Sequence, residues 1–301
     1  YVSEVKENNS GNRLLGLVLP FLRSSIIPEF VQGATKAAEE LNYNIILKDS
    51  ENDIDKENEV INNLLNNSVD GLVIFPAYFK YYSSKILNLL GKKEPMVMIG
   101  RHYTRLPIPN IHAENYKGMK KATRFLINHG CSNLGFISTK LTSISSIESR
   151  LKGFKDECLK SNINTNIEFL PIETKESIVD PASANIDFPE LDQRNNKQTE
   201  RNIKDIINFL KVNPDLDGVL TCHDLLALYT IRAAKRIGKK VPEDIQIIGF
   251  DDAPFATQIK PSLSTVKVPR YKMGYEGVKL CVDIIHNQDK TYREKLDQTK
   301  F

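Results

Sequence analysis

Short apolar runs alternate along the chain with longer segments in which apolar residues recur every three or four positions. Two of the runs, residues 14–19 and 71–75, end at a proline and are typical of strands that are buried on both faces. Residues 28–41 instead place their apolar side chains on one face of a helix. Strand and helix signals in this order predict βαβ units, in which helices cover both faces of a parallel sheet.

The same alternation continues to the end of the chain and is too long for a single sheet. Further strands are predicted at residues 44–47, 95–99, 134–137, 167–171, 217–220, 245–250 and 264–268. Further helices are predicted at residues 53–65, 82–90, 116–129, 146–160, 200–211, 224–237 and 273–286. We therefore expect an α/β protein with two doubly wound parallel sheets, with the break between them near residues 107–113.

Length and composition support two globular lobes. The 301 residues are 41% hydrophobic and 26% charged, which is enough apolar material for a core in each lobe. No apolar run approaches the roughly 20 residues that span a bilayer, so we expect no membrane partner. Residues 1–12 are polar and predict a linker without a secretory signal, which favours a cytoplasmic protein. Residues 173–196 lack an apolar period and predict an irregular insertion.

Charge and motif content argue against several kinds of site. The 41 basic and 38 acidic side chains leave a net charge of +3, which is too balanced for a nucleic-acid-binding surface in this chain. The four cysteines form no C-x-x-C pair and the five histidines lack ligand spacing, so we expect reduced thiols and no metal site. The sequence has neither a phosphate-binding loop nor a dinucleotide fingerprint, so we expect no cofactor.

An enzyme is one alternative, in which Asp251, Asp252 or His223 acts as an acid or base. We expect no enzyme, because the sequence offers no nucleophile paired with a base. Cys222 is adjacent to His223, but neighbouring side chains at a strand end point in opposite directions, which predicts that the two do not share a proton. Cys222 is interpreted as a small buried residue.

Candidate binding residues follow the predicted strands, since sites in doubly wound proteins lie at the carboxyl edge of the sheet. Aromatic, basic and acidic groups suit a sugar, whose hydroxyls bond to Arg and carboxylates and whose C–H faces lie on aromatic rings. The candidates are Phe21, Arg23, Tyr78, Arg101, His102, Arg150, His223, Asp251 and Asp252. Two alternatives stay open: Arg150 is a solvated helix residue paired with Glu148 or Asp156, or the two aspartates cap a turn.

Several ordered motifs together resemble one protein family. They are Glu114–Gly118, Arg150–Phe154, Val241–Ile245, Ile248–Asp252, Pro261–Val266 and Met273–Gly274. From about Asn12 onward, the chain resembles the effector-binding domains of the lactose/galactose-repressor (LacI/GalR) family of transcription regulators. The stretch Ile26–Gly33 resembles the arabinose-repressor branch, whose DNA-binding domain is of a winged-helix type.

The resemblance implies a periplasmic-binding-protein type I fold, in which two lobes are joined by three crossovers. It implies an N-terminal lobe of residues 13–111 plus 268–290 and a C-terminal lobe of residues 112–267 plus 291–301. In this family a small ligand, usually a sugar, binds in the cleft between the lobes.

Candidate site residues carry over from the family position by position. The resemblance implies that Arg150 and Asp251 hold sugar hydroxyls, and that Glu114 belongs to the acidic pair of the family motif. His223 stands where the family usually has Asn, and the carboxylate that usually precedes Arg101 is replaced by a glycine. These departures leave the identity of the sugar open.

We therefore expect the ligand-sensing and dimerisation domain of a sugar-responsive repressor. A small sugar such as arabinose would change lobe closure, and with it the binding of operator DNA by an upstream domain that this sequence does not include. The expected partners are the sugar, operator DNA and a second copy of the chain. The alternative is an extracytoplasmic sugar-binding protein of a transporter, which shares the fold.

Overall fold

The computed structural model describes residues 13–77, 82–139, 145–170 and 196–287. Three predicted segments fall outside these residues. They are the linker at 1–12, the insertion at 173–196 except for its last residue, and the return of residues 291–301 to the C-terminal lobe.

The chain divides into two compact units. The first unit draws its described residues from Tyr1–Leu22, Glu29–Ile111 and Arg270–Thr299. The second unit draws them from Arg23–Pro28 and His112–Pro269. Each unit therefore combines segments that are far apart in the sequence.

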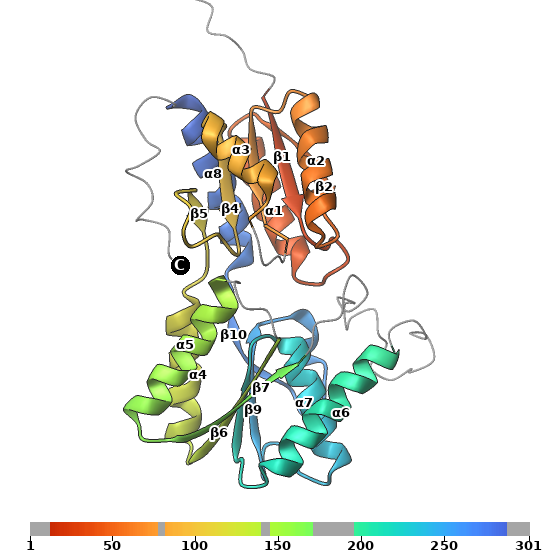
Figure 1. Cartoon of the computed structure of the whole chain (residues 1–301), viewed down its shortest axis with the longest axis vertical. Helices are drawn as coiled ribbons and strands as arrows, with labels where there is room; N and C mark the ends of the chain where they lie inside the picture. The colour runs from red at the N-terminus through yellow and green to blue at the C-terminus, as the bar shows by residue number, and fades with distance from the viewer. Residues whose placement is uncertain (1–12, 78–81, 140–144, 171–195, 288–301) are drawn as a thin grey trace, which may run out of the picture. The chain divides into compact units, whose positions relative to one another are not determined.

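The first unit is built on a five-stranded parallel sheet with the order β2-β1-β3-β4-β5 (Figure 1). Its strands are β1 (Leu14–Leu19), β2 (Asn44–Asp49), β3 (Gly71–Ile74), β4 (Met96–Ile99) and β5 (Asn110–Ile111). The helices that accompany it are α1 (Ile27–Glu40), α2 (Ile54–Asn66), α3 (Ser84–Lys92) and α8 (Arg270–His286). Because all five strands are parallel, their carboxyl ends share one edge of the sheet.

Apolar helix faces cover this sheet. The carboxylate of Asp53 accepts hydrogen bonds from the backbone N–H groups of Asp55 and Lys56, at 3.0 and 2.9 Å, so α2 begins at Ile54. One core cluster beneath α2 and α3 consists of Val18, Val60, Ile61, Leu64, Leu72, Ile74, Ile86, Leu89, Met96, Met98 and Ile108. Burial of these side chains holds the helices on the sheet.

Helices α1 and α8 approach each other closely through a pair of glycines. A Cβ atom on Gly33 would lie 1.9 Å from the backbone oxygen of Tyr271. A Cβ on Gly274 would lie 2.1 Å from the backbone oxygen of Phe30. Helix α8 is thereby packed against α1, and it also contacts β3 and β4.

The second unit contains another five-stranded parallel sheet, with the order β10-β9-β8-β6-β7 (Figure 1). Its strands are β6 (Asn133–Thr139), β7 (Asn164–Leu170), β8 (Gly218–Thr221), β9 (Gln246–Asp251) and β10 (Ser264–Lys267). Its helices are α4 (Asn115–Asn128), α5 (Ser145–Lys160), α6 (Asn196–Val212), α7 (Asp224–Arg236) and the short 3₁₀ helix η1 (Pro254–Thr257). Helices α4 and α5 pack together, as do α6 and α7.

The prediction of two doubly wound parallel sheets is confirmed. Every strand and helix that the hydrophobic pattern predicts is present, with ends shifted by a few residues. Two elements were not predicted: β5, which is an edge strand of two residues, and η1. Both are too short to carry a periodic pattern.

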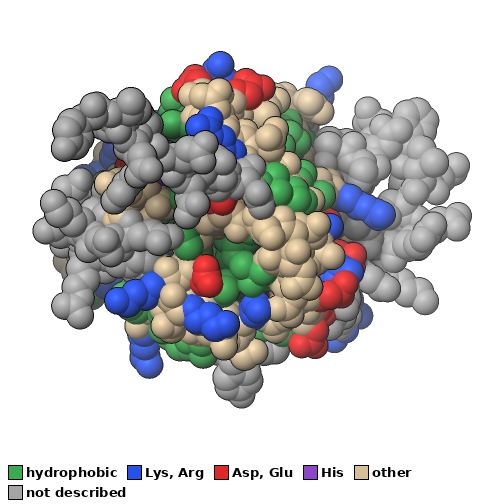
Figure 2. All heavy atoms as spheres, turned by 90° about the horizontal axis from the view of Figure 1, so that it is seen from above, with side chains coloured by type: hydrophobic (Ala, Val, Ile, Leu, Met, Phe, Trp, Pro, Cys, Tyr) green, Lys and Arg blue, Asp and Glu red, His purple; other side chains and the backbone are tan. Residues whose placement is uncertain are grey.

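The distribution of charged side chains and the state of the cysteines agree with the predictions of balanced charge and reduced thiols. Basic and acidic side chains are interspersed on the face shown in Figure 2. The four cysteines are free and buried. Among the residues that the structure describes, no helix is both long enough and apolar enough to cross a membrane.

Candidate ligand-binding site

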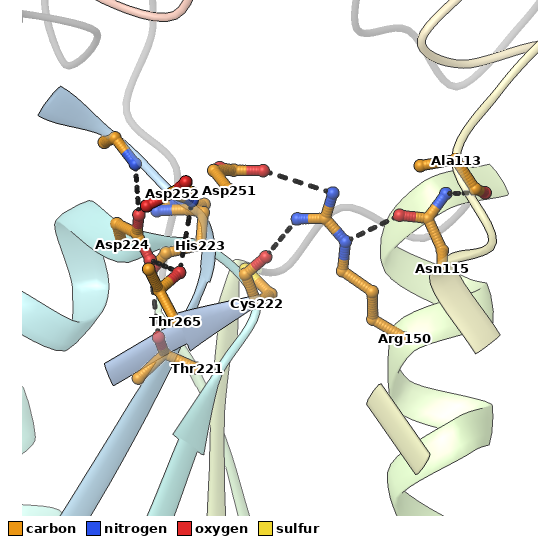
Figure 3. Close-up of polar contacts among 11 residues, drawn as sticks. Ala113, Asn115, Arg150, Thr221, Cys222, His223, Asp224, Asp251, Asp252 and Thr265 are labelled. Carbon is orange, nitrogen blue, oxygen red and sulfur yellow. Dashed lines mark hydrogen bonds and ion pairs between the residues drawn. The ribbon is translucent and has the colours of Figure 1, made fainter. Parts of the chain in front are cut away.

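Arg150 lies on α5 but is buried at the carboxyl edge of the second sheet, with 8% of the residue exposed. Its Nε donates to Asn115 Oδ1 at 2.9 Å, and its Nη1 donates to the carbonyl oxygen of Cys222 at 2.5 Å. Its Nη2 lies 3.3 Å from Asp251 Oδ1. Figure 3 shows the guanidinium between Asn115 on one side and Cys222 and Asp251 on the other.

The aromatic ring of Phe250 covers one face of this guanidinium. The Cζ atom of Arg150 lies 3.7 Å from the ring centroid, and the negative face of the ring attracts the cation. The alternative in which Arg150 is a solvated residue is therefore wrong. Asp156, one of the partners considered for it, instead accepts a hydrogen bond from Tyr116 at 2.9 Å and pairs with Lys152.

Gly153 explains the spacing of the Arg150–Phe154 motif. Residues three apart share one face of a helix, so Gly153 lies one turn from Arg150 on the side that meets α4. A Cβ on Gly153 would lie 2.5 Å from the backbone oxygen of Tyr116. The missing side chain lets α5 approach the first turn of α4, where Asn115 lies.

Asp251, the last residue of β9, and Asp252 form a strained turn. Both have positive φ values, of 131° and 57°, which are uncommon for residues with a side chain. The carboxylate of Asp251 faces Arg150, whereas that of Asp252 lies 3.7 Å from Lys267 Nζ. The two adjacent carboxylates therefore have different partners.

The carboxylate of Asp224 is hydrogen-bonded to this turn, both directly and through Thr265. Its Oδ2 accepts a hydrogen bond from the N–H of Ala253 at 2.7 Å, and its Oδ1 accepts one from Thr265 Oγ1 at 2.5 Å. Thr265 Oγ1 in turn accepts a hydrogen bond from the N–H of Asp252 at 3.2 Å (Figure 3). Burial raises the pKa of Asp224 to about 6, and the negative charge of Asp251 adds to this effect.

His223 caps the first turn of α7. Its Nδ1 accepts a hydrogen bond from the N–H of Leu226 at 3.4 Å, and its carbonyl oxygen accepts one from Thr221 Oγ1 at 2.8 Å. That Cys222 and His223 do not share a proton stays a prediction, but each affects the ionisation of the other: His223 lowers the pKa of Cys222, and Cys222 raises the pKa of His223. The strand alternation on which it relied ends at Thr221, and the chain turns into the helix immediately afterwards.

Cys222 is nevertheless enclosed. Burial opposes ionisation of the thiol, but the charge and the hydrogen bond of His223 outweigh burial and lower the pKa of Cys222. The residue is 0% exposed, and its carbonyl oxygen is bonded to Arg150. A substrate approaching the surface does not reach this sulfur.

In the first unit, Arg101 lies against two aromatic rings. Its Cζ atom lies 4.7 Å from the ring centroid of Phe75 and 5.8 Å from that of Phe21. The two rings are tilted, with centroids 6.2 Å apart. Arg101 is 6% exposed, so much of its side chain serves packing in this unit.

Glu57 is a buried acid near this cluster. Its Oε2 accepts a hydrogen bond from the N–H of Ala77 at 2.6 Å, in the segment that follows β3. Its Oε1 has no hydrogen-bond partner among the described residues. Burial raises the pKa of Glu57 to about 7, although Ala77 and Arg101 both favour the charged form.

The remaining candidates lie in separate places. Arg23 is exposed in the turn before α1, and His102 is half-buried after β4. Glu114 precedes α4, and its carboxylate lies 3.2 Å from Lys117 Nζ. Tyr78 falls outside the described residues.

Sequence reasoning missed several residues of these clusters. They are Asn115, Asp224 and Thr265 in the second unit, and Glu57 and Phe75 in the first. Four had a readable signal: Asn115 and Thr265 belong to the Glu114–Gly118 and Pro261–Val266 motifs, Asp224 follows the predicted strand at 217–220, and Phe75 ends the one at 71–75. Glu57 lies on the apolar stripe of a predicted helix, but nothing in the sequence pointed to its partners.

The second unit thus presents a fixed guanidinium and a fixed carboxylate at one sheet edge. Such a pair donates hydrogen bonds to, and accepts them from, hydroxyl groups of one ligand. No set of three or more His, Cys, Asp and Glu side chains is placed to hold a metal ion within the described parts of the chain.

Two doubly wound lobes, with an Arg–Asp pair at a sheet edge, define a periplasmic-binding-protein type I domain. The family model for periplasmic binding protein-like domains matches residues 123–300. The model for periplasmic binding proteins and the sugar binding domain of the LacI family matches residues 12–176. The chain belongs to the LacI family of effector-binding domains, and the resemblance found in its motifs is confirmed.

Curated relatives of this chain include proteins named as repressors of a ribose operon or of arabinose metabolism. The ribose operon repressor of Bacillus subtilis is 31% identical over 279 residues, which cover 92% of this chain and 75% of the relative. The ribose operon repressor of Halalkalibacterium halodurans is 26% identical, covering 94% and 76%. The arabinose metabolism transcriptional repressor of Geobacillus stearothermophilus is 24% identical, covering 92% and 71%.

Solved structures share the fold. The transcription regulator CcpA of Lactococcus lactis has a TM-score of 0.74 at 22% identity, covering 92% of this chain and 93% of that chain. A LacI family transcriptional regulator from Enterococcus faecium with bound ribose has a TM-score of 0.71 at 19% identity, covering 92% of both chains. These similarities confirm the predicted type I fold.

Proposed function

We propose that this chain is the sugar-sensing domain of a transcriptional repressor and that its effector is a pentose, such as arabinose or ribose. Membership of the LacI family and the names of the relatives support a regulator over a transporter's binding protein or an enzyme. Arabinose is favoured by the Ile26–Gly33 stretch, and both pentoses occur in the names of relatives. Operator DNA and a second copy of the chain are the proposed macromolecular partners.

The observation that carries the proposal is the pairing of Arg150 with Asp251 at the carboxyl edge of the second sheet. Their side chains are 10% and 17% exposed, so the pair is mostly buried yet reachable. A sugar hydroxyl donates to the Asp251 carboxylate while a neighbouring hydroxyl accepts from Arg150. Each hydrogen bond to a charged group contributes about 1.5–3 kcal/mol.

Isothermal titration calorimetry with D-ribose and L-arabinose tests the proposal. We expect Arg150→Ala and Asp251→Ala each to weaken pentose binding by at least about 2 kcal/mol, roughly 30-fold in Kd. Lys155→Ala is the control, because this lysine lies exposed on the same helix. Unchanged affinity in both site variants contradicts the site, and no binding of either pentose by the parent chain contradicts the ligand class.

A further inference from the structure

Asp224 is almost fully buried in a place where an ionised carboxylate is costly. It is 2% exposed, and it faces two other titratable side chains, those of Asp251 and His223. A Cβ on Gly249 of β9 would lie 2.1 Å from Asp224 Oδ1, so the absence of a side chain there leaves room for the carboxylate. Both oxygens are satisfied by donors, as the contacts with Ala253 and Thr265 show.

These donors belong to the turn that carries Asp251. Asp224 binds the N–H of Ala253, and Thr265 binds the N–H of Asp252 while donating its own proton to Asp224. Two consecutive peptide N–H groups are therefore held by one carboxylate and one hydroxyl. The backbone of Asp251, with φ of 131°, lies directly before them.

A strained conformation of this kind persists only where the surroundings hold it. The side chain of Asp251 reaches Arg150 from this backbone conformation. A turn released from Asp224 and Thr265 would relax toward ordinary φ values and carry the Asp251 carboxylate away from the guanidinium.

We propose that Asp224 and Thr265 are positioning residues for ligand binding, which hold the turn of residues 251–253 so that Asp251 faces Arg150. The inference rests on the proposed function, because it assigns these residues to the same pentose site. Neither residue needs to touch the sugar: both act through Asp251.

Thr265 offers the sharper test, because its substitutions keep the strand intact. Thr265→Val retains the shape but loses the hydroxyl, whereas Thr265→Ser restores the hydroxyl without the methyl group. Ser264→Ala is the matched control, since it removes an exposed hydroxyl from the neighbouring position of β10. D-ribose and L-arabinose are titrated into each variant by calorimetry, and each melting temperature is recorded.

We expect Thr265→Val to weaken pentose binding at least tenfold and Thr265→Ser to recover most of the loss. The same substitutions are then made together with Asp251→Ala. Because Thr265 acts through Asp251, Thr265→Val should change the remaining affinity by less than twofold in that background. An equal loss in both backgrounds, or no loss in the parent chain, overturns the proposal. If Thr265→Val acted only by disturbing the packing, it would reduce pentose affinity equally in the parent chain and in the Asp251→Ala background.

Asp224 is tested in parallel with two variants. Asp224→Asn keeps one acceptor for Ala253 and can donate to Thr265, whereas Asp224→Ala removes both contacts. We expect the affinity of Asp224→Asn to lie closer to that of the parent chain than the affinity of Asp224→Ala. Equal losses in the two variants contradict a positioning role for the carboxylate's hydrogen bonds.

A measurement without sugar separates this inference from the proposed function. In ¹⁵N-arginine-labelled protein, the side-chain signal of Arg150 is assigned by its disappearance in Arg150→Lys. We expect Thr265→Val and Asp251→Ala to shift this signal in the same way, and Ser264→Ala to leave it in place. A signal that moves with Asp251→Ala but not with Thr265→Val overturns the positioning role. If the shifts occur but no pentose binds, only the proposed ligand fails.

Discussion

Arg150 Nη2 and Asp251 Oδ1 lie 3.3 Å apart, and each side chain is held in place by other residues. Asn115 and the carbonyl oxygen of Cys222 fix the guanidinium, so it is not free to follow the carboxylate. Asp251 is fixed by its backbone. A pair oriented in this way loses little conformational entropy when a ligand binds, which favours affinity.

The two adjacent aspartates should differ sharply in function. Asp251→Asn removes the charge that faces Arg150, and we expect pentose affinity to fall by at least about 1.5 kcal/mol. Asp252→Asn removes a charge that faces Lys267 in a more exposed pair, whose contribution is about 0–1 kcal/mol. Calorimetric titration of both variants with the same pentose makes the comparison. Equal losses of affinity in the two variants would show that the orientation of the Asp251 carboxylate toward Arg150 does not govern binding.

Strain at Asp251 predicts that glycine stabilises the protein more than alanine does at this position, which is the reverse of the order expected in an ordinary strand. Asp251→Gly removes the Cβ that disfavours a φ of 131°, whereas Asp251→Ala keeps it. We expect the glycine variant to be more stable than the alanine variant by roughly 1 kcal/mol in urea unfolding. Ser264 in β10 has ordinary backbone geometry, so Ser264→Ala should be more stable than Ser264→Gly. A higher unfolding free energy for Asp251→Ala than for Asp251→Gly would contradict the strain at this residue.

The strands and helices could be predicted because their signals are local. The run at Leu14–Leu19 and the stripe of Val60, Ile61 and Leu64 follow from the periods of a strand and a helix. The strand-end rule also predicted Asp251 at the carboxyl edge of a sheet, whereas for Arg150 it left a solvated position open and the family resemblance pointed to the site. The prediction of the elements used spacing along the chain, and the prediction of the site used the parallel direction of the strands.

The burial of charged side chains was harder to predict, although part of the signal was present. Glu57 stands three and four residues before Val60 and Ile61, so it shares the buried face of α2. Arg150 stands in the same way between Ile147 and Phe154 on α5. A charged residue on an apolar stripe indicates a buried partner, but the partners come from distant segments. Their identity depends on the three-dimensional arrangement and not on the pattern.

Close packing at Gly249 predicts a contrast between two glycine substitutions. Gly249→Ala places a Cβ on β9 only 2.1 Å from Asp224 Oδ1 and 3.1 Å from Leu263 Cδ2, and we expect a loss of at least about 2 kcal/mol in unfolding free energy. Gly91→Ala adds a Cβ to α3 with no atom within 4 Å, and should stabilise the chain by about 0.5–1 kcal/mol. Urea denaturation of both variants checks the pair. A stable Gly249→Ala protein would show that Asp224 moves freely.

Glu57 should make the stability of the chain depend on pH. Its pKa rises from a reference value of 4.5 to about 7 in the folded protein, mainly through burial. The folded state therefore binds this proton more tightly than the unfolded state does. The resulting stabilisation is fully present below pH 4.5 and is lost as the pH rises through about 7. A shift of this size corresponds to about 3 kcal/mol.

Glu57→Gln removes the titration while keeping an oxygen that accepts the bond from Ala77. We expect this variant to gain stability relative to the parent chain as the pH is raised from 5 to 8, because it has no proton to lose. Glu59→Gln on the same helix is the control, since the Glu59 side chain is 70% exposed and its variant should follow the parent curve. Urea midpoints measured across this range provide the comparison, and parallel curves for Glu57→Gln and the parent chain would show that Glu57 is already ionised in the fold.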